Sequence, residues 1–282
     1  MNPEKINQSK IAISKGILNV LERYVPAKAY SEHLEDIVFL LTDALLQGKL
    51  YISFNKSVDS HIELKAHGWP KEHYQALLDS KWIEGELSPM KLEGKQLSWR
   101  RWYCEMNDVI QELLDRATST SNIKHLSPNK NLVGYLNKEQ QAAVDSVHNC
   151  KVILLSGGPG TGKTNTIIQM LLEILTVDPF LKIGLSAPTG KATRRLQETL
   201  QQNSKSLTAD YKDKLTTIPC RTLHSWLEAR SNGFGKNKTS PLNIDVLVVD
   251  EMSMVDLTLI KGLLDALPKT TKLILVGDPN QL

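Results

Sequence analysis

The sequence predicts an α/β protein in which a small, mainly helical domain precedes a domain built on a parallel β-sheet. Two observations lead to this fold class. In the C-terminal half, short β-branched apolar runs alternate with helical patterns, as in a parallel sheet with helices on both faces. In the N-terminal half, apolar residues recur mostly at helical spacing. We expect a first domain over residues 1–118, a linker over 119–131 and the sheet domain over 132–282.

The N-terminal half is expected to form a helical domain without catalytic residues. Apolar residues repeat at helical spacing between Ser31, placed to cap a helix, and Gly48, placed to end it. Residues 50–54 alternate like a strand, residues 70–78 form a short helix, and the segment 97–103 leads into a helix that reaches about residue 116. The histidines of this half are expected at scattered surface positions: His33, His61, His67 and His73.

The polar stretch 119–131 separates this domain from the region where strands and helices alternate. Strands are expected over 151–156, 182–187, 244–249 and 272–276. Helices are expected to start at Gly162, Thr189 and Asp256. The segment 232–238 is expected to be a flexible polar excursion.

A glycine-rich octapeptide joins the first of these strands to its helix. It consists of Gly157, Gly158, Pro159, Gly160, Thr161, Gly162, Lys163 and Thr164. Glycines let the backbone curl so that successive N–H groups and the positive end of the helix can hold a polyphosphate. Lys163 is placed to reach the terminal phosphates, and the Thr164 hydroxyl to ligate a magnesium ion that bridges them. We therefore expect ATP and Mg²⁺ as ligands.

Two carboxylates, Asp250 and Glu251, follow the buried apolar run of residues 245–249. Asp250 is expected to hold the magnesium ion through water, and Glu251 to orient and deprotonate the attacking water. The alternative is that Asp250 caps the next helix and Glu251 is a solvated charge; the phosphate cradle favours the nucleotide interpretation. Beyond the last strand, Gln281 is expected to contact the γ-phosphate, although the residues before it also fit an ordinary turn.

Composition places few further limits on function. The net charge is +3 and the pI about 8.6, and residues 1–130 carry equal numbers of basic and acidic side chains, so the excess lies in the second half. This is compatible with a track for a phosphate backbone. The three cysteines, Cys104, Cys150 and Cys220, lack metal-ligand spacing and are expected to be reduced and buried. Because no apolar run approaches about 20 residues and no secretion signal opens the chain, we expect a cytoplasmic protein without a membrane segment.

Two segments are candidates for nucleic-acid contact. Residues 187–196 place a helix N-terminus at the carboxyl end of a strand, and residues 221–226 combine a hydroxyl, basic groups and an aromatic ring. Each has a plain alternative: Thr189 as a helix cap, Lys191 and Arg195 as a solvated face, and Trp226 as core packing.

The order of these segments resembles the first motifs of superfamily 1B DNA helicases, and the resemblance is strongest to the alpha subunits of bacterial exodeoxyribonuclease V, the RecD family. The matching segments are Gln140 within 136–140, then 157–164, 187–196, 222–224, 250–251 and 277–282. In the first half, residues 45–49 and 97–103 resemble that family's N-terminal domain, which docks on the gamma subunit.

The resemblance implies a RecA-like P-loop NTPase domain and a role for each matched residue. Gln140 would read the adenine, Lys163 and Thr164 would hold phosphates and magnesium, and Asp250 and Glu251 would act as metal ligand and base. Gln281 would link the γ-phosphate to the DNA track. That track would be lined by Pro188, Thr189, Thr222 and His224. The implied partners are single-stranded DNA and the beta and gamma subunits of exodeoxyribonuclease V.

The function expected from the resemblance is an ATP-dependent 5′ to 3′ DNA helicase subunit of exodeoxyribonuclease V in recombinational double-strand-break repair. The family has a second RecA-like domain that supplies an arginine to the transferring phosphoryl group, whereas this sequence ends at Leu282. We expect a truncated motor or a subunit that relies on another chain, with weak ATP binding, slow hydrolysis and no translocation. The alternatives are a stand-alone superfamily 1B helicase and a non-hydrolysing docking module.

Overall fold

The computed structural model describes residues 3–58, 62, 64–118 and 136–278. The chain divides into two compact units, Met1–Asn107 and Asp108–Leu282, and the boundary falls inside helix α4 (Arg100–Thr118). The expected linker 119–131 lies outside the described residues, so the domain boundaries expected from the sequence stay predictions.

The first unit packs helices around a small antiparallel sheet. Its elements are α1 (Pro3–Tyr24), α2 (Glu32–Leu46), β1 (Ile52–Ser53), α3 (Lys71–Ser80), β2 (Met90–Glu93), β3 (Gln96–Trp99) and the start of α4. The strands lie in the order β1-β3-β2, and the core gathers Leu34, Ile37, Leu77, Trp82 and Met90. The predictions of α2, α3 and α4 are confirmed, and the predicted strand 50–54 is reduced to two residues.

Two side-chain predictions for this unit are wrong. His73 is fully buried, with its Nε2 atom 3.3 Å from Oδ2 of Asp36, rather than on the surface. Asp36 also accepts the backbone N–H groups of Lys65 and Ala66, so this pair ties a loop to α2. The expectation that all three cysteines are buried is wrong, because Cys104 is exposed and Cys150 and Cys220 of the second unit are half-buried; all three are free.

The second unit is built on a five-stranded parallel sheet with the order β4-β10-β9-β5-β6. Its strands are β4 (Val152–Ser156), β5 (Ile183–Ala187), β6 (Cys220–Thr222), β9 (Val246–Val249) and β10 (Lys272–Gly277). The four strands expected from the sequence are therefore confirmed, and the short edge strand β6 is added to them. Because all five run in parallel, their carboxyl ends share one edge, where α/β proteins bind ligands.

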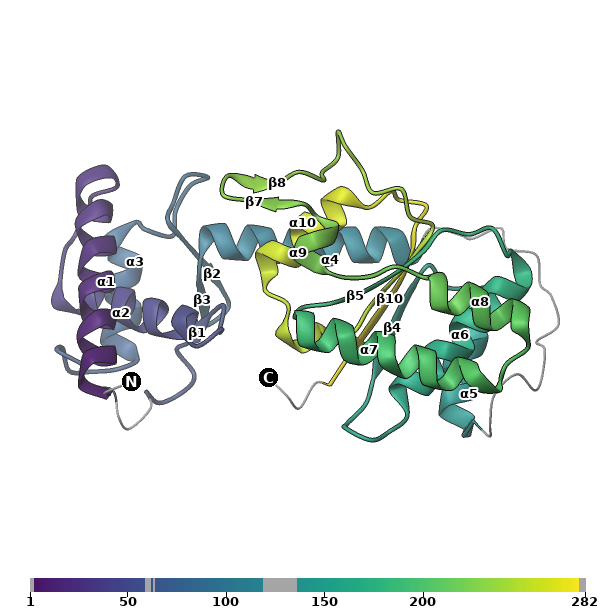
Figure 1. Cartoon of the computed structure of the whole chain (residues 1–282). Coiled ribbons are helices and arrows are strands. Elements are labelled where there is room, and N and C mark those ends of the chain that lie inside the picture. The colour runs from purple at the N-terminus through teal and green to yellow at the C-terminus, as the bar shows by residue number, and fades with distance from the viewer. Residues whose placement is uncertain (1–2, 59–61, 63, 119–135, 279–282) are drawn as a thin grey trace. The chain divides into compact units, whose positions relative to one another are not determined.

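Helices cover both faces of this sheet, as the sequence predicts (Figure 1). One face carries α5 (Lys138–Asp145), α6 (Lys163–Val177), α7 (Gly190–Asn203) and α8 (Ala209–Thr217). The other carries the end of α4, α9 (Leu223–Trp226) and α10 (Leu257–Ala266). Short 3-10 turns occupy Ser146–His148, Ser204–Ser206 and Met252–Met254. The expected polar excursion at 232–238 contains part of a hairpin, β7 (Ala229–Arg230) with β8 (Gly233–Phe234).

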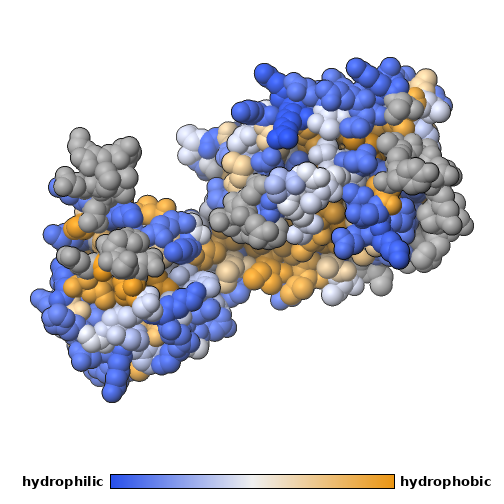
Figure 2. All heavy atoms as spheres, turned by 90° about the horizontal axis from the view of Figure 1, so that it is seen from below, coloured by the Kyte–Doolittle hydropathy of each residue, from blue (hydrophilic) through white to orange (hydrophobic). Residues whose placement is uncertain are grey.

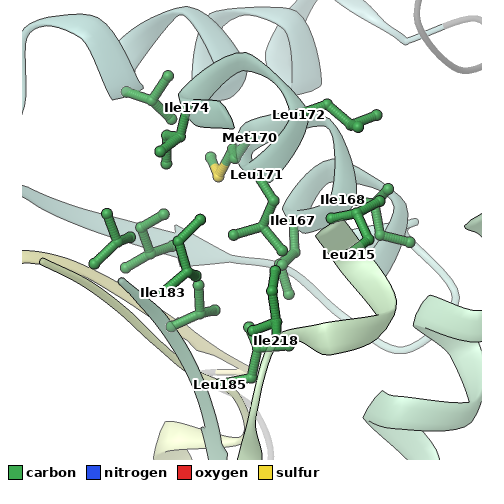
Figure 3. Close-up of a cluster of buried hydrophobic side chains, with 14 of the residues drawn as sticks. Ile167, Ile168, Met170, Leu171, Leu172, Ile174, Ile183, Leu185, Leu215 and Ile218 are labelled. Atoms are coloured by element: carbon green, nitrogen blue, oxygen red, sulfur yellow. The ribbon is translucent and has the colours of Figure 1, made fainter. Parts of the chain in front are cut away.

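The core on the α6 face explains why this helix is apolar almost all round. Figure 3 shows Ile167 and Leu171 of α6 over Ile183 and Leu185 of β5, and all four side chains are buried. Burial of such side chains contributes about 1.5–3 kcal/mol each. The first residue of α6 is Lys163, so this packing fixes the helix end that carries the phosphate loop.

Hydrophobic residues also reach the surface. In Figure 2 a band of them shows between the hydrophilic residues of the larger unit. Leu154 on the edge strand β4 is 71% exposed, and Phe180 in the turn before β5 is 90% exposed. In the part of the chain that the structure describes, none of the helices has the length and apolar character needed to cross a membrane.

Candidate nucleotide-binding site

The loop between β4 and α6 has the backbone of a phosphate cradle. Gly160 and Gly162 have φ angles of +76° and +80°, a conformation that other residues rarely adopt. Gly162 is the N-cap of α6, so the free N–H groups of the helix start face the loop. A hydrogen bond of 3.2 Å from the Gly157 N–H to the Gly277 carbonyl joins the loop to the end of β10.

The glycines of the loop serve different purposes. A Cβ on Gly157 would meet Oγ1 of Thr161 at 2.8 Å, and a Cβ on Gly162 would meet Nε2 of Gln140 at the same distance, so neither tolerates a side chain without a shift. Gly158 and Gly160 have nothing within 4 Å of such an atom and border open space. The loop is thus tight against the protein on one side and open on the other, as a polyphosphate requires.

Lys163 lies at the inner end of the loop. Its Nζ atom donates to the carbonyls of Gly157 at 2.5 Å and Gly158 at 2.8 Å. The ammonium group is therefore held beside the loop by two neutral acceptors, and no carboxylate of the described residues forms an ion pair with it. An anionic phosphate is a stronger acceptor than a carbonyl, so it can replace these contacts.

The acidic pair reaches the same edge of the sheet from β9. Val249, the last residue of β9, is paired with Leu275, two residues before Gly277, which is itself paired with Ser156 of β4. Asp250 and Glu251 therefore follow β9 at the same edge as the loop that follows β4, and the end of β10 lies between these two strands. The alternative that Asp250 caps the next α-helix is not supported, because Asp256 caps α10 by accepting the Leu259 N–H.

The backbone turns sharply at Glu251. This residue has φ 53° and ψ 45°, a left-handed conformation that is uncommon outside glycine. Its N–H donates to Oδ1 of Asp250 at 2.9 Å, and its carbonyl accepts from the Met254 N–H at 3.1 Å. The turn costs on the order of 1 kcal/mol, and strain of this size often marks functional sites.

The electrostatics of Asp250 reflect its position between the sheet and the loop. Burial raises the pKa of the Asp250 carboxyl above its ordinary value, and the neighbouring charge of Glu251 raises it further. The Glu251 N–H and the positive charges of Lys163 and Arg195 act in the opposite direction. A cation that binds next to Asp250 therefore relieves an existing cost.

These residues surround one cavity of about 420 Å³. It is lined by Pro159, Gly160, Thr161, Gly162, Lys163, Thr164, Asn165, Ala192, Arg195, Leu196, Thr199, Asp250, Glu251, Ser253, Gly277 and Asp278. Thr164 and Asp250, the two expected metal ligands, both belong to this lining. No group of three or more His, Cys, Asp or Glu side chains within the described ranges is able to hold a metal ion. Thr164 and Asp250 would supply a hydroxyl and a carboxylate oxygen, which suit magnesium, an ion that keeps water and phosphate oxygens as its other ligands.

Gln140 lies behind the loop and not in the cavity lining. Its side-chain oxygen accepts the Asn137 N–H at 3.0 Å, and its Nε2 donates to the Thr161 carbonyl at 3.0 Å. The Gln140 side chain therefore completes the capping box of α5 and also binds the phosphate loop. An adenine contact from Gln140 stays a prediction.

The residues expected to contact DNA lie at the carboxyl ends of β5 and β6. Ala187 and Thr222 are register partners, so Pro188 and Thr189 follow one strand beside the residues that follow the other. Thr189 and His224 are exposed and Thr222 is half-buried. The plain alternatives also describe the structure: Thr189 caps α7, and Trp226 is buried with its indole N–H donating to the Leu185 carbonyl. Thr222 likewise caps α9.

Some residues of the cavity lining were not predicted from the sequence, and one predicted site residue is not among those that the structure describes. Gln281 falls outside the described residues. The cavity lining adds Arg195, Thr199, Ser253 and Asp278 to the expected set. Residues 195 and 199 are one helical turn apart in α7, so helical spacing places them on a common face, but only the fold shows that this face borders the loop.

A parallel sheet with a glycine-rich loop, a lysine at the helix start and an acidic pair on a neighbouring strand defines a P-loop nucleotide-binding domain, the class of P-loop ATPases. A family model described as "AAA domain" matches residues 140–282, and the chain belongs to this family. It is a RecD-like chain of helicase superfamily 1.

Three relatives illustrate the similarity. The RecBCD enzyme subunit RecD of Mycolicibacterium smegmatis is 35% identical over 260 residues, 88% of this chain and 46% of that protein. Its counterpart in Buchnera aphidicola is 30% identical over 272 residues, 92% of this chain and 42% of that protein. The ATP-dependent RecD2 DNA helicase of Deinococcus radiodurans is 37% identical over 149 residues, 52% of this chain and 18% of that protein. The chain thus spans less than half the length of each of these relatives.

Proposed function

We propose that this chain is the nucleotide-binding part of an ATP-dependent DNA helicase that moves 5′ to 3′ along single-stranded DNA. We further propose that it acts as the RecD-type subunit of exodeoxyribonuclease V in recombinational double-strand-break repair, with the beta and gamma subunits as partners. The observation that carries the proposal is the cavity where Lys163, Thr164, Asp250 and Glu251 meet at the carboxyl edge of the sheet.

In this proposal each residue predicted to act on the nucleotide has one task in ATP hydrolysis. The loop N–H groups and the Lys163 ammonium hold the phosphates and orient the terminal one. The Thr164 hydroxyl and Asp250 hold magnesium, which neutralises phosphate charge when bound. Glu251 accepts a proton from the attacking water. Gln281 responds to the presence of the terminal phosphate.

The proposed DNA track uses the neighbouring part of the same edge. The hydroxyls of Thr189 and Thr222 accept helix N–H groups, and each still has its own proton to donate to a phosphate oxygen. His224 is exposed beside them and can contact the backbone or a base. Nucleotide and DNA would then bind at adjacent strand ends of one sheet.

The extent of similarity favours an exodeoxyribonuclease V subunit over a stand-alone helicase. Similarity to the two RecD subunits spans about nine tenths of this chain and so includes most of the first unit, whereas similarity to the RecD2 helicase spans about half. The second candidate, a stand-alone helicase, rests on that RecD2 similarity. It predicts unwinding by the complete protein without beta and gamma subunits.

The test is binding of a fluorescent magnesium–ATP analogue to the 282-residue chain and to its Lys163→Ala variant. We expect binding that Lys163→Ala weakens by roughly a hundredfold, because the variant removes a charge-assisted contact to phosphate. The matched control is Lys212→Ala, which removes an exposed lysine on α8 and should bind like the unaltered chain. Equal affinity of Lys163→Ala and the unaltered chain would refute the proposal.

A steady-state ATPase assay with and without single-stranded DNA, with beta and gamma subunits added, separates the alternatives. DNA-stimulated turnover that requires these subunits supports the proposed assembly, and turnover without them supports a stand-alone helicase. Binding without turnover under every condition supports a docking module instead.

A further inference from the structure

Arg195 of α7 is a cavity residue for which the proposed hydrolytic steps have no role. It is exposed and lines the cavity together with Ala192, Leu196 and Thr199 of the same helix. Ala192, Arg195, Leu196 and Thr199 recur at the three- and four-residue spacing of a single helix face. This face of α7 borders the cavity that the phosphate loop also lines. The neighbouring Arg194 is exposed as well but does not line the cavity.

The charge of Arg195 acts on the reacting end of the cavity. Its guanidinium lowers the pKa of Asp250, so the two groups lie close enough to interact. Among the described residues no carboxylate lies within ion-pair distance of Arg195, and its five N–H donors remain available. Lys163 and Arg195 are the cationic side chains in the described lining, and they come from different helices.

The two cations differ in what they can do. Lys163 is held against the loop by the Gly157 and Gly158 carbonyls and therefore serves the phosphates that lie over the loop. Arg195 lines the cavity from α7, which follows β5, and β5 is paired with β9, the strand that ends before Asp250. A guanidinium also offers a planar fork that matches two phosphate oxygens, which an ammonium cannot offer.

We propose that Arg195 donates hydrogen bonds to the terminal phosphate of the bound nucleoside triphosphate and thereby makes this chain prefer a triphosphate to a diphosphate. The inference rests on the proposed nucleotide binding. It gives the chain its own arginine for the terminal phosphate, positioned by the same helix whose N-cap is Thr189 at the β5 edge.

The experiment compares the affinities of the 282-residue chain for magnesium AMP-PNP and magnesium ADP by fluorescence competition. Arg195→Gln should weaken AMP-PNP binding by roughly ten- to a hundredfold and change ADP binding less than about twofold, because ADP lacks the phosphate concerned. Arg195→Lys keeps the charge without the fork and should give an intermediate loss. Arg194→Gln, the matched control, should change neither affinity.

The outcomes distinguish the two proposals. If Lys163→Ala weakens both nucleotides but Arg195→Gln leaves the AMP-PNP to ADP ratio unchanged, the role of Arg195 is refuted and nucleotide binding stands. If Arg195→Gln weakens both nucleotides equally, Arg195 does not read the terminal phosphate. If the unaltered chain binds neither nucleotide, both proposals fail. Circular dichroism checks that each variant is folded. If Arg195→Gln is not folded, Arg195→Lys takes its place in the comparison.

Discussion

Lys272 is a buried cation in an interior strand of the sheet. It begins β10, is 7% exposed, and its Nζ atom donates to the Cys150 carbonyl. Burial lowers the pKa of Lys272 to about 8, and the nearby charge of Lys151 acts in the same direction. Below pH 8 the folded and unfolded states both carry the proton, so the folded state bears the full cost of a buried ammonium group.

This pKa predicts how stability changes with pH. Between pH 8 and the ordinary lysine pKa of 10.5, the folded state has lost the proton and the unfolded state still holds it. The free energy of unfolding should therefore rise over this window, by on the order of 3 kcal/mol. Lys272→Met should be more stable than the unaltered protein at pH 7, and the difference should shrink towards pH 10. Urea unfolding at both pH values measures it.

The control for this prediction is Lys269→Met, three residues away, where the side chain is 75% exposed and its removal should leave the pH dependence unchanged. Parallel stability profiles for Lys272→Met and the unaltered protein would show that Lys272 does not titrate in this window.

At the residue scale, the predictions were accurate where the position of a residue in the chain is enough to locate its side chain. Lys163 and Asp250 follow parallel strands, whose carboxyl ends must share an edge, and both do line the cavity, although their roles stay predictions. Arg195 offered no such signal, since an exposed helical arginine has many possible neighbours. His73 was placed wrongly because its partner Asp36 lies 37 residues away, and a pairing of that kind leaves no local pattern.

At the scale of elements, Arg116 binds α4 to the end of α10. Its guanidinium donates to the carbonyls of Leu264, Leu267 and Pro268 at 3.1, 2.8 and 2.8 Å and pairs with Glu112 at 3.0 Å. These carbonyls belong to the last turn of α10 and the residues after it, which have no partners within the helix. Arg116 is 2% exposed, so water cannot replace it.

Arg116→Met should therefore destabilise the second unit by about 3–5 kcal/mol, because the buried carbonyls of Leu264 and Leu267 lose their donor and Glu112 loses its nearest cation. Arg101→Met is the matched control on the same helix: its pair with Glu105 has the same i to i+4 spacing, but the Arg101 side chain is 71% exposed. That change should cost less than about 0.5 kcal/mol. Hydrogen exchange of the α10 amides provides the measurement. Equal protection in the two variants would contradict the assignment.

Burial accounts for part of the success of element prediction. β9 is buried along its whole length and reads as a continuous apolar run, and the buried strand β5 is interrupted only by Gly184 and Ser186. The edge strand β4 is only partly buried but is also apolar up to its last residue. Strand β6 was missed because it is a three-residue edge strand that contains an exposed arginine. Helix α1 was missed as well: Ile11, Ile13 and Val20 are exposed on it, so its apolar residues do not follow one helical stripe.

At the scale of the whole molecule, each unit has its own core, and the candidate site belongs entirely to the second. The sequence could predict that the site belongs to the second unit, because the phosphate loop, the acidic pair and the alternating strands all fall after residue 136. It could not predict the order of the strands in the sheet. That order rests on pairings between strands that lie far apart in the sequence, and it places β9 and β10 between β4 and β5.

Helix α7 gives a reason to expect that DNA and nucleotide influence each other. It begins beside Thr189, whose hydroxyl caps it, and its next turns carry Arg195 and Thr199 to the nucleotide cavity. If single-stranded DNA binds at the β5–β6 edge, it contacts the first turn of a helix whose later turns border the nucleotide. Binding at one end then changes the free energy of binding at the other.

We predict that magnesium AMP-PNP and a single-stranded oligonucleotide change each other's affinity by the same factor, roughly 5- to 150-fold, as thermodynamic linkage requires. Thr189→Ala removes the cap and frays the first turn of α7, which should reduce this factor. Thr208→Ala is the control, because Thr208 occupies the N-cap of α8 without a side-chain hydrogen bond to that helix. Fluorescence titrations of each ligand with and without the other measure the factor. Two ligands that bind independently, or a factor that Thr189→Ala leaves unchanged, would exclude α7 as the connection between the two sites.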